Sequence, residues 1–222
     1  MKLIIENKEY KLPVRLKIDE WSKLAQWDFE DELNWPHILH IYSGAPIDKL
    51  KSAKREALEL GVSLCAATMS LRVEHKGKDL QSLLFGEWID MEVLISKGIA
   101  KSLQEVSVVL ETHTQWADEA IYVYEQYLKW RNTIYRSYAN LFGTEDTEEE
   151  DPRDQKDPHA IQRAWYRIIV GLADGNILNI DAVIEQPIIK TLNFLALEKQ
   201  MNLEDQARLV QQQRKYDLQR TR

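Results

Sequence analysis

The stretch that decides the fold is WADEAIYVYEQYLKWRNTIYRSYANLF, which runs from residue 116 to residue 142. Its apolar and aromatic residues recur every three or four positions, which is the period of an α-helix. We therefore expect one long helix that begins at Thr114 or Gln115, ends near Phe142 and buries this stripe. The repeating residues are Trp116, Ala120, Val123, Tyr127, Trp130, Ile134, Tyr138 and Leu141.

The overall composition supports helices in the rest of the chain. The 222 residues include only 8 glycines and 6 prolines, and these are the residues that most often interrupt regular structure. The chain is 44% hydrophobic and 29% charged, which is ordinary for a globular protein. The predicted fold is therefore mainly α, a multi-helix bundle-like domain with a small N-terminal β-hairpin.

Residues 1–18 carry that β-type pattern. Residues 3–5 and 10–12 are short apolar runs on either side of a polar turn at residues 6–9, which predicts a hairpin. The next residues alternate between apolar and charged side chains, which is typical of a further strand. A lone hairpin is marginal in water, so we expect it to pack on the helical body or to pair with another chain. The alternating apolar residues are Val14, Leu16 and Ile18.

Helical spacing also predicts a series of other helices. Asp19 is suited to cap the first of them, because its carboxylate can accept hydrogen bonds from free backbone N–H groups. Gly44 and Gly98 are suited to end two others. The expected helical segments are 19–27, 36–44, 48–73, 88–96, 103–110, 159–173, 181–186 and 187–199.

The charge distribution predicts the domain organisation. The net charge is −7, and residues 145–157 alone hold eight acids against one arginine and one lysine. We expect a solvated acidic linker at 145–158, between a main helical region at 19–144 and a helical subdomain at 159–200. Residues 201–222 are polar and predict a helical or disordered tail. No broad basic face is expected, which disfavours binding to duplex DNA.

The chemistry-bearing residues form no recognisable site. His37 and His40 are the only histidines close in sequence, whereas zinc requires three or four ligands. Glu87 and Asp90 share a helix face, where we expect carboxylates to stabilise the helix N-terminus. Phosphate-loop and nucleophile motifs are absent. We therefore expect a protein that is not an enzyme, with no catalytic, metal-binding or cofactor-binding residues.

Two alternatives to this expectation stay open. One is an enzyme whose site is assembled from dispersed residues such as Glu87, Asp90 and His113. The other is a nucleic-acid-associated protein that uses the arginine and aromatic side chains of residues 116–142 to stack on bases.

Some aromatic residues of the 116–142 stretch lie off its main stripe. Tyrosine and arginine are enriched in interface hot spots, so side chains left off the core stripe are candidates for a protein contact. The candidate interface residues are Tyr122, Tyr124, Arg131, Tyr135 and Arg136.

The single cysteine and the apolar runs predict the environment of the protein. Cys65 cannot form an internal disulfide, which fits a reducing compartment. The N-terminus has charges inside its apolar run and does not have the pattern of a signal peptide. No apolar stretch approaches the roughly 18 residues that a membrane span needs. We expect a soluble, intracellular protein.

Three stretches carry a family resemblance. Residues 83–92 (LLFGEWIDME), 130–138 (WRNTIYRSY) and 165–174 (WYRIIVGLAD), the last followed by Pro187 and residues 192–199 (LNFLALEK), resemble small proteins encoded in the tail modules of tailed bacteriophages. The similarity is a pattern of spaced aromatic and aliphatic residues over roughly residues 80–200, and it supplies no functional residue.

The resemblance implies a role in tail or baseplate assembly, as a virion component or an assembly chaperone. Its partners would be other tail or baseplate proteins, with self-association as a further expectation. The protein would then be found in the cytoplasm of the infected host cell and in the virion.

Overall fold

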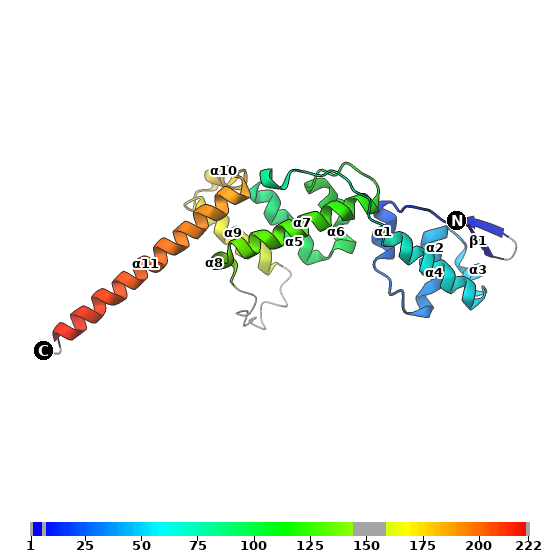
Figure 1. Cartoon of the computed structure of the whole chain (residues 1–222), viewed down its shortest axis with the longest axis horizontal. Coiled ribbons are helices and arrows are strands. Elements are labelled where there is room, and N and C mark those ends of the chain that lie inside the picture. Colours follow the sequence, from blue (N-terminus) through cyan, green and yellow to red (C-terminus); the bar gives the residue numbers. More distant parts are fainter. Residues whose placement is uncertain (1, 6–7, 144–158, 221–222) are drawn as a thin grey trace. The chain divides into compact units, whose positions relative to one another are not determined.

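The computed structural model describes residues 2–5, 8–143 and 159–220. The predicted acidic linker at 145–158 therefore lies outside the described residues. Within the described ranges the chain forms 11 α-helices, one two-stranded sheet and short 3-10 helices, which confirms the predicted mainly α class (Figure 1). None of the helices in these ranges has both the length and the hydropathy that crossing a membrane requires.

The chain divides into two compact units. Unit 1 comprises residues 1–78 and 90–128, and unit 2 comprises residues 79–89 and 129–222. Helices α5 (Phe85–Lys97) and α7 (Ala117–Ser137) each contribute residues to both units. The predicted division at 145–158 lies outside the described residues and stays a prediction.

Unit 1 begins with the hairpin and continues into short helices. Strand β1 (Lys2–Ile5) pairs antiparallel with β2 (Lys8–Lys11), and Leu3 lies opposite Tyr10. The predicted hairpin is therefore confirmed (Figure 1). The helical elements that follow in this unit are α1 (Ile18–Leu24), η1 (Glu32–Asn34), α2 (Trp35–Ser43), α3 (Ile47–Lys51), α4 (Arg55–Met69) and α6 (Ile99–Val109).

One hydrophobic core joins the hairpin to the helices of unit 1. The buried hairpin residues Leu3, Ile5 and Tyr10 belong to the same cluster as residues of α1, α2 and α4. The helices α2 and α4 approach closely at Gly61, where a Cβ atom would lie 2.9 Å from Leu39 Cδ2. This contact explains why a glycine is accepted inside a helix despite its low propensity.

The predicted strand at residues 14–18 is wrong. The alternation of burial is present, since Val14 is exposed while Leu16 and Ile18 are buried. This alternation of burial arises in a loop that hydrogen-bonds to the residues around the start of α7, not in a strand of a sheet. The Ile18 N–H donates to the Gln115 carbonyl (3.0 Å), and the Leu16 carbonyl accepts from Ala117 (3.0 Å). Ile18 is already the first residue of α1, so Asp19 lies in the first turn and does not precede it.

The predicted single helix at 48–73 is two helices. Helix α3 ends at Lys51, and the Ser52 hydroxyl donates to the Lys49 carbonyl (3.0 Å), a local bond that competes with helix continuation. Lys54 is extended, with ψ 140°, and α4 begins after it. No glycine or proline marks this break, so the sequence carries no signal for it.

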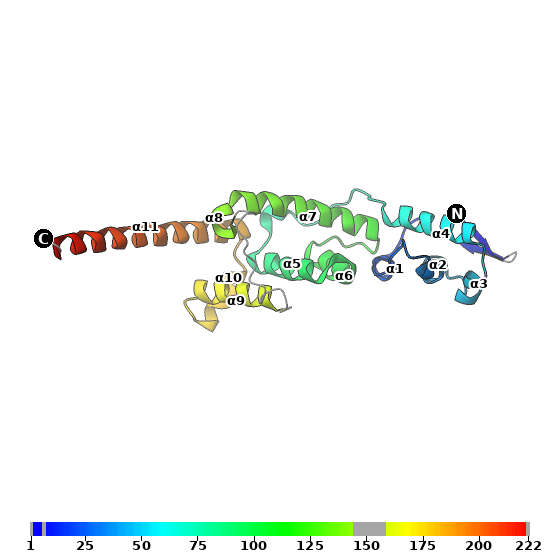
Figure 2. The same ribbon diagram turned by 90° about the horizontal axis from the view of Figure 1, so that it is seen from below.

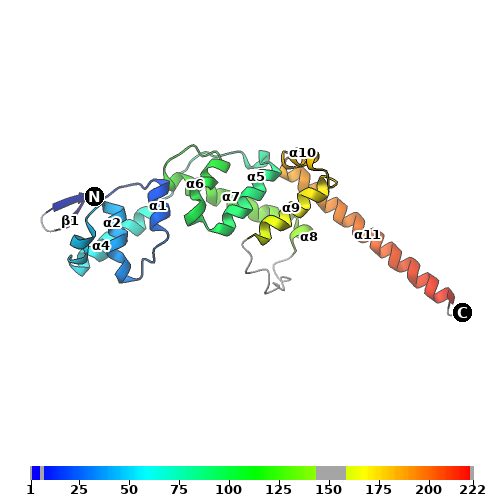
Figure 3. The same ribbon diagram turned by 180° about the vertical axis from the view of Figure 1, so that it is seen from behind.

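Unit 2 contains the remaining helical elements. They are η2 (Leu80–Ser82), α8 (Ala139–Phe142), α9 (Ala160–Leu172), η4 (Ile177–Asn179), α10 (Ile180–Ile184) and α11 (Ile188–Arg220). Figures 2 and 3 show α9 and α10 side by side near the start of α11. The segment before α5 is held to the start of α11 by two backbone bonds, from Phe85 to Gln186 (2.8 Å) and from Ile188 to Leu83 (2.9 Å).

Aromatic rings fill the core of unit 2. Trp88 is fully buried and contacts Trp130 edge to face at 5.7 Å between ring centroids. Phe85 meets Trp165 in the same edge-to-face geometry at 5.9 Å. Such pairs are favourable beyond the burial of their area, so packing accounts for Phe85, Trp88, Trp130 and Trp165 of the resemblance stretches, whereas Tyr166 is exposed.

Two predicted helix ends are revised in unit 2. The helix expected to end near Phe142 is interrupted at Tyr138, whose backbone leaves helical geometry (φ −115°, ψ 38°) before α8. Its hydroxyl donates to Asn193 at 2.8 Å, which ties the interruption to α11. The segment 201–222, predicted as a separate helical or disordered tail, continues α11 as one helix to Arg220.

Candidate functional site

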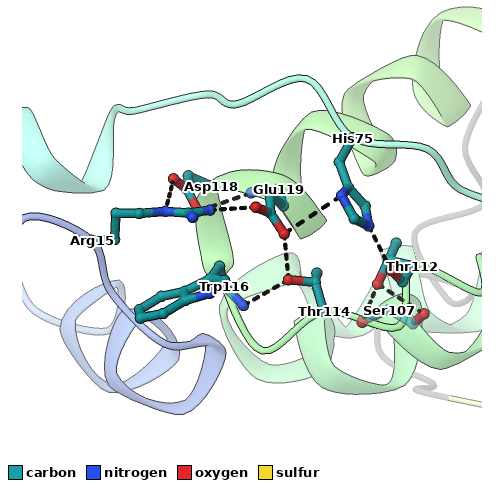
Figure 4. Close-up of polar contacts among 8 residues, drawn as sticks. All are labelled: Arg15, His75, Ser107, Thr112, Thr114, Trp116, Asp118 and Glu119. Atoms are coloured by element: carbon teal, nitrogen blue, oxygen red, sulfur yellow. Dashed lines mark hydrogen bonds and ion pairs between the residues drawn. The ribbon is translucent and has the colours of Figure 1, made fainter.

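In unit 1, polar contacts link eight residues in a group that we call the polar cluster (Figure 4). It joins the loop before α1, the segment after α4, the loop after α6 and the first turn of α7. Its members are Arg15, His75, Ser107, Thr112, Thr114, Trp116, Asp118 and Glu119.

Arg15 is the centre of the polar cluster. Its guanidinium donates through Nε and Nη2 to both carboxylate oxygens of Asp118, each at 2.7 Å, and Nη2 also donates to Glu119 at 2.7 Å. The same group lies over the Trp116 ring at 4.8 Å. The hydrogen bonds to Asp118 and Glu119 raise the pKa of Arg15 above its usual range, despite opposition from burial. Both carboxylates sit in the first turn of α7, where the helix dipole also favours negative charge.

Glu119 connects the two sides of the polar cluster. Burial opposes ionisation of this carboxyl, but hydrogen bonds from Thr114 and Arg15, and the nearby charge of Arg15, outweigh it and lower its pKa. The Thr114 hydroxyl donates to Oε2 at 2.5 Å, and His75 Nδ1 lies 3.5 Å from the same oxygen. An ionised Glu119 therefore has a partner in three separate segments of unit 1.

The imidazole of His75 is held between a carboxylate and a backbone carbonyl. Nε2 lies 2.6 Å from the Thr112 carbonyl oxygen, and because a carbonyl only accepts, Nε2 carries the proton. The hydroxyls of Ser107 and Thr112 bond to each other at 2.5 Å. A nucleophile needs a hydrogen bond to its base, whereas here the imidazole bonds to a main-chain oxygen. The His75 imidazole therefore joins the segment after α4 to the loop after α6 and to the first turn of α7.

The structure divides the predicted interface residues between the units. Tyr122 and Tyr124 lie in unit 1, where Tyr122 is half-buried and Tyr124 is only 9% exposed. Tyr124 therefore belongs to the interior, because α7 buries a wider face than the predicted stripe. Arg131, Tyr135 and Arg136 lie in unit 2, and Arg136 is exposed.

Of these five residues, Arg131 and Tyr135 contact each other. The Arg131 guanidinium lies 4.3 Å from the Tyr135 ring centroid and donates to its hydroxyl at 3.1 Å. The Tyr135 ring also stacks on Phe142 at 4.3 Å and on Trp88 at 6.0 Å. These contacts occupy the ring faces that stacking on a nucleic-acid base would use.

Glu87, Asp90 and His113 are the dispersed residues that the enzyme alternative would use. The Glu87 carboxylate accepts a hydrogen bond from the Leu84 N–H (2.9 Å) just before α5, which confirms the predicted capping role. Asp90 and His113 are exposed. In the part of the chain that is described, no three His, Cys, Asp or Glu side chains are grouped as a metal site would require.

The histidine pair of α2 is engaged in local contacts. The His37 ring stacks on Trp27 with 5.2 Å between centroids. His40 Nδ1 lies 2.7 Å from the Ala45 carbonyl, which gives this nitrogen a partner where the helix ends. His37 therefore stabilises the start of α2, and His40 stabilises its end.

A second candidate surface lies in unit 2 and involves α11. A groove of about 590 Å³ runs between α8, α9 and α11, and Phe142, Trp165 and Leu195 are among its apolar lining residues. Every α11 residue from Leu197 to Arg214 is exposed, and the groove lining extends along this stretch as far as Gln206. The sequence analysis predicted residues 201–222 as a polar helical or disordered tail suited to docking, but did not predict the groove that α8 and α9 form beside α11. The large apolar residues exposed on α11 are Phe194, Leu197, Met201, Leu203, Leu209 and Val210.

Comparison with known proteins gives no relative for this chain. No protein-family model matches it, and neither a curated protein nor a solved structure shows significant similarity.

Proposed function

We propose that this protein acts without catalysis, through protein–protein contacts in the assembly of a bacteriophage tail or baseplate, and that α11 is its docking element. The observation that carries the proposal is the exposure of α11 from Leu197 to Arg214 together with its large apolar residues. Leu203 and Leu209 are 58% and 63% exposed, whereas Ile188 and Leu192 near the start of the same helix are buried.

Two physical arguments favour docking at α11. A helix in a protein gains most of its stability from packing an apolar face, so the exposed stretch of α11 from Leu197 to Arg214 is suited to pack on a partner. The exposed face also leads into the apolar groove at Phe142 and Trp165, which offers a partner more area than the helix alone. Recognition of a helix through apolar anchors at spacings of three and four residues is a common binding mode.

The phage context rests on the resemblance of residues 83–92, 130–138 and 165–174 to tail-module proteins. In this structure those stretches supply core and groove residues of unit 2, such as Trp88, Trp130 and Trp165. Apart from residues 90–92, the resemblance therefore falls on the unit that carries α11.

Deletion of residues 202–222 tests the docking role. Because every described side chain removed is exposed, we expect the thermal unfolding midpoint of the remaining chain to stay within a few degrees. Co-purification with co-expressed tail or baseplate proteins should be lost. The matched control is Leu33→Gln, which removes an apolar side chain that is 83% exposed in unit 1 and should leave co-purification intact. Capture of the same tail protein by the deletion variant would exclude α11 as the docking element.

Mass spectrometry of purified virions beside the infected-cell lysate separates the two proposed roles. Presence in virions identifies a structural component, and presence in the lysate alone identifies an assembly chaperone. A protein found in neither sample during infection would contradict the proposal.

A further inference from the structure

The groove of unit 2 is one end of a longer face on α11. Leu195 and Leu203 line the groove together with Phe142 and Trp165. With 3.6 residues per turn, positions 195, 199, 202, 206, 209 and 213 follow each other along one side of the helix. Leu209 lies on this side, and Leu203 and Val210 lie beside it. The face therefore continues past the groove to the exposed part of the helix. We call it the groove face.

The opposite side of α11 provides an internal reference. Leu197 and Met201 point away from the groove face by the same helical geometry, and both are 56% exposed. Leu197 and Leu203 thus have the same side chain and nearly the same exposure on different sides of one helix. A contact along the groove face should depend on Leu203 and not on Leu197.

Charge is distributed unevenly along α11. Residues 194–206 contain three acids against one lysine, a net charge of −2, whereas residues 207–222 contain four arginines and one lysine against one aspartate, a net charge of +4. Two copies of the helix aligned in parallel would place like charge beside like charge. Two copies aligned antiparallel would place each acidic half beside the basic half of the other.

We propose that the groove face of α11 pairs antiparallel with the groove face of a second copy of this chain. With the two-fold axis at Gln206, Leu203 of each copy lies beside Leu209 of the other, and the two Gln206 amides meet, where each can donate and accept. The interface is isologous and closed, as in most homodimers. This inference rests on the proposed function and deepens it, because it makes a second copy the first partner of α11.

Molar mass in solution tests the pairing. Light scattering after size exclusion should give a dimer for the full chain. The dissociation constant of the dimer should increase at least tenfold for Leu203→Asp and for Leu209→Asp. Leu197→Asp, the control on the opposite side, should remain a dimer. Circular dichroism of all three variants should match the full chain, because each substituted residue is exposed. A monomeric full chain at all concentrations, or equal effects of Leu197→Asp and Leu203→Asp, would overturn the proposal.

Engineered cysteines test the direction of pairing. In the antiparallel register, residue 199 of one copy lies opposite residue 213 of the other, while the two copies of residue 199 are roughly 21 Å apart. A mixture of the Lys199→Cys and Gln213→Cys proteins should therefore cross-link, and neither variant should cross-link with itself. The native Cys65 is fully buried and does not interfere. Self-cross-linking of Lys199→Cys without cross-linking in the mixture would show a parallel pair and overturn the proposal.

The outcomes separate this inference from the proposed function. A monomer that still captures a tail protein through α11 overturns the self-pairing and leaves the proposed function standing. The other outcome is a dimer that persists in Leu197→Asp, dissociates in Leu203→Asp and captures no tail protein. That result supports the self-pairing and contradicts the tail role.

Discussion

Arg15 and Asp118 form a two-pronged ion pair, with both carboxylate oxygens 2.7 Å from guanidinium nitrogens and the Asp118 side chain only 5% exposed. The pair joins the loop before α1 to the first turn of α7, although the two residues are 103 positions apart. Planar bidentate geometry makes such a pair stronger and more directional than a single contact. The N-terminal segment is therefore fixed to the long helix by a partly buried charge pair, in addition to the core.

Replacing Arg15 by alanine should destabilise unit 1. Asp118 would remain buried without its partner, and loss of hydrogen bonds to a charged group costs about 2–3 kcal/mol. The free energy of unfolding, from urea titration followed by tryptophan fluorescence, should fall by that amount. The control is Arg55→Ala, which breaks the more exposed ion pair with Glu32 and should change stability by no more than about 0.5 kcal/mol. Equal losses in the two variants would refute a special role for Arg15.

Acid should weaken the polar cluster through Glu119. Its pKa is lowered in the folded state, so ionised Glu119 contributes stability that is present at neutral pH. This contribution declines as the pH falls below the unfolded-state value of about 4.3 and is lost through the lower folded-state pKa. Between pH 6 and pH 3, the unfolding midpoint should therefore drop more steeply for the native chain than for Glu119→Gln. Parallel profiles for the two proteins would contradict this linkage.

Cys65 should be inert while the protein is folded. It is fully buried, and burial raises the pKa of its thiol to about 12, so almost no thiolate forms near neutral pH. A chromogenic disulfide reagent at pH 8 should label far less than one thiol per chain within minutes, and one thiol after addition of denaturant. Rapid labelling of the native protein would show that the core between α2 and α4 opens readily.

Two glycine substitutions should change stability in opposite directions. At Gly77 a Cβ atom would lie 2.4 Å from Val123 Cγ1 and 3.0 Å from the Leu110 carbonyl, so Gly77→Ala should cost about 1–3 kcal/mol. Gly171 is exposed within α9 and has no atom within 4 Å of that position, so Gly171→Ala should add about 0.5–1 kcal/mol. Thermal unfolding of both variants measures the signs. A stabilised Gly77→Ala protein would show that the loop at residues 74–78 does not pack on α7.

The sequence predicted well wherever local periodicity and capping decide structure. The hairpin, the helix at 160–172 and the helix ends at Gly44 and Gly98, both with positive φ, follow from patterns within a few residues. Helix interruptions that coincide with side-chain hydrogen bonds were not predicted. Ser52 and Lys54 interrupt a periodic stretch without glycine or proline, and Tyr138 leaves helical geometry where its hydroxyl contacts Asn193.

The candidate sites were less predictable than the fold. Arg15 and His75 are far from each other and from Glu119 in the chain, and nothing in their spacing indicates that two loops and the first turn of α7 bring them together. The candidate interface of Tyr122, Tyr124, Arg131, Tyr135 and Arg136 rests on positions off the main stripe of one helix, yet Tyr124 is buried and Tyr135 is stacked between Phe142 and Trp88.

By itself, the sequence determined the helical class, the hairpin and most helices, because these depend on hydrogen bonds and side-chain periodicity over short separations. Tertiary structure alone decided where the compact units divide, which polar side chains meet at Arg15, and which face of α11 stays uncovered. Those features depend on contacts between residues distant in the chain, and packing selects among arrangements that local propensity leaves equal.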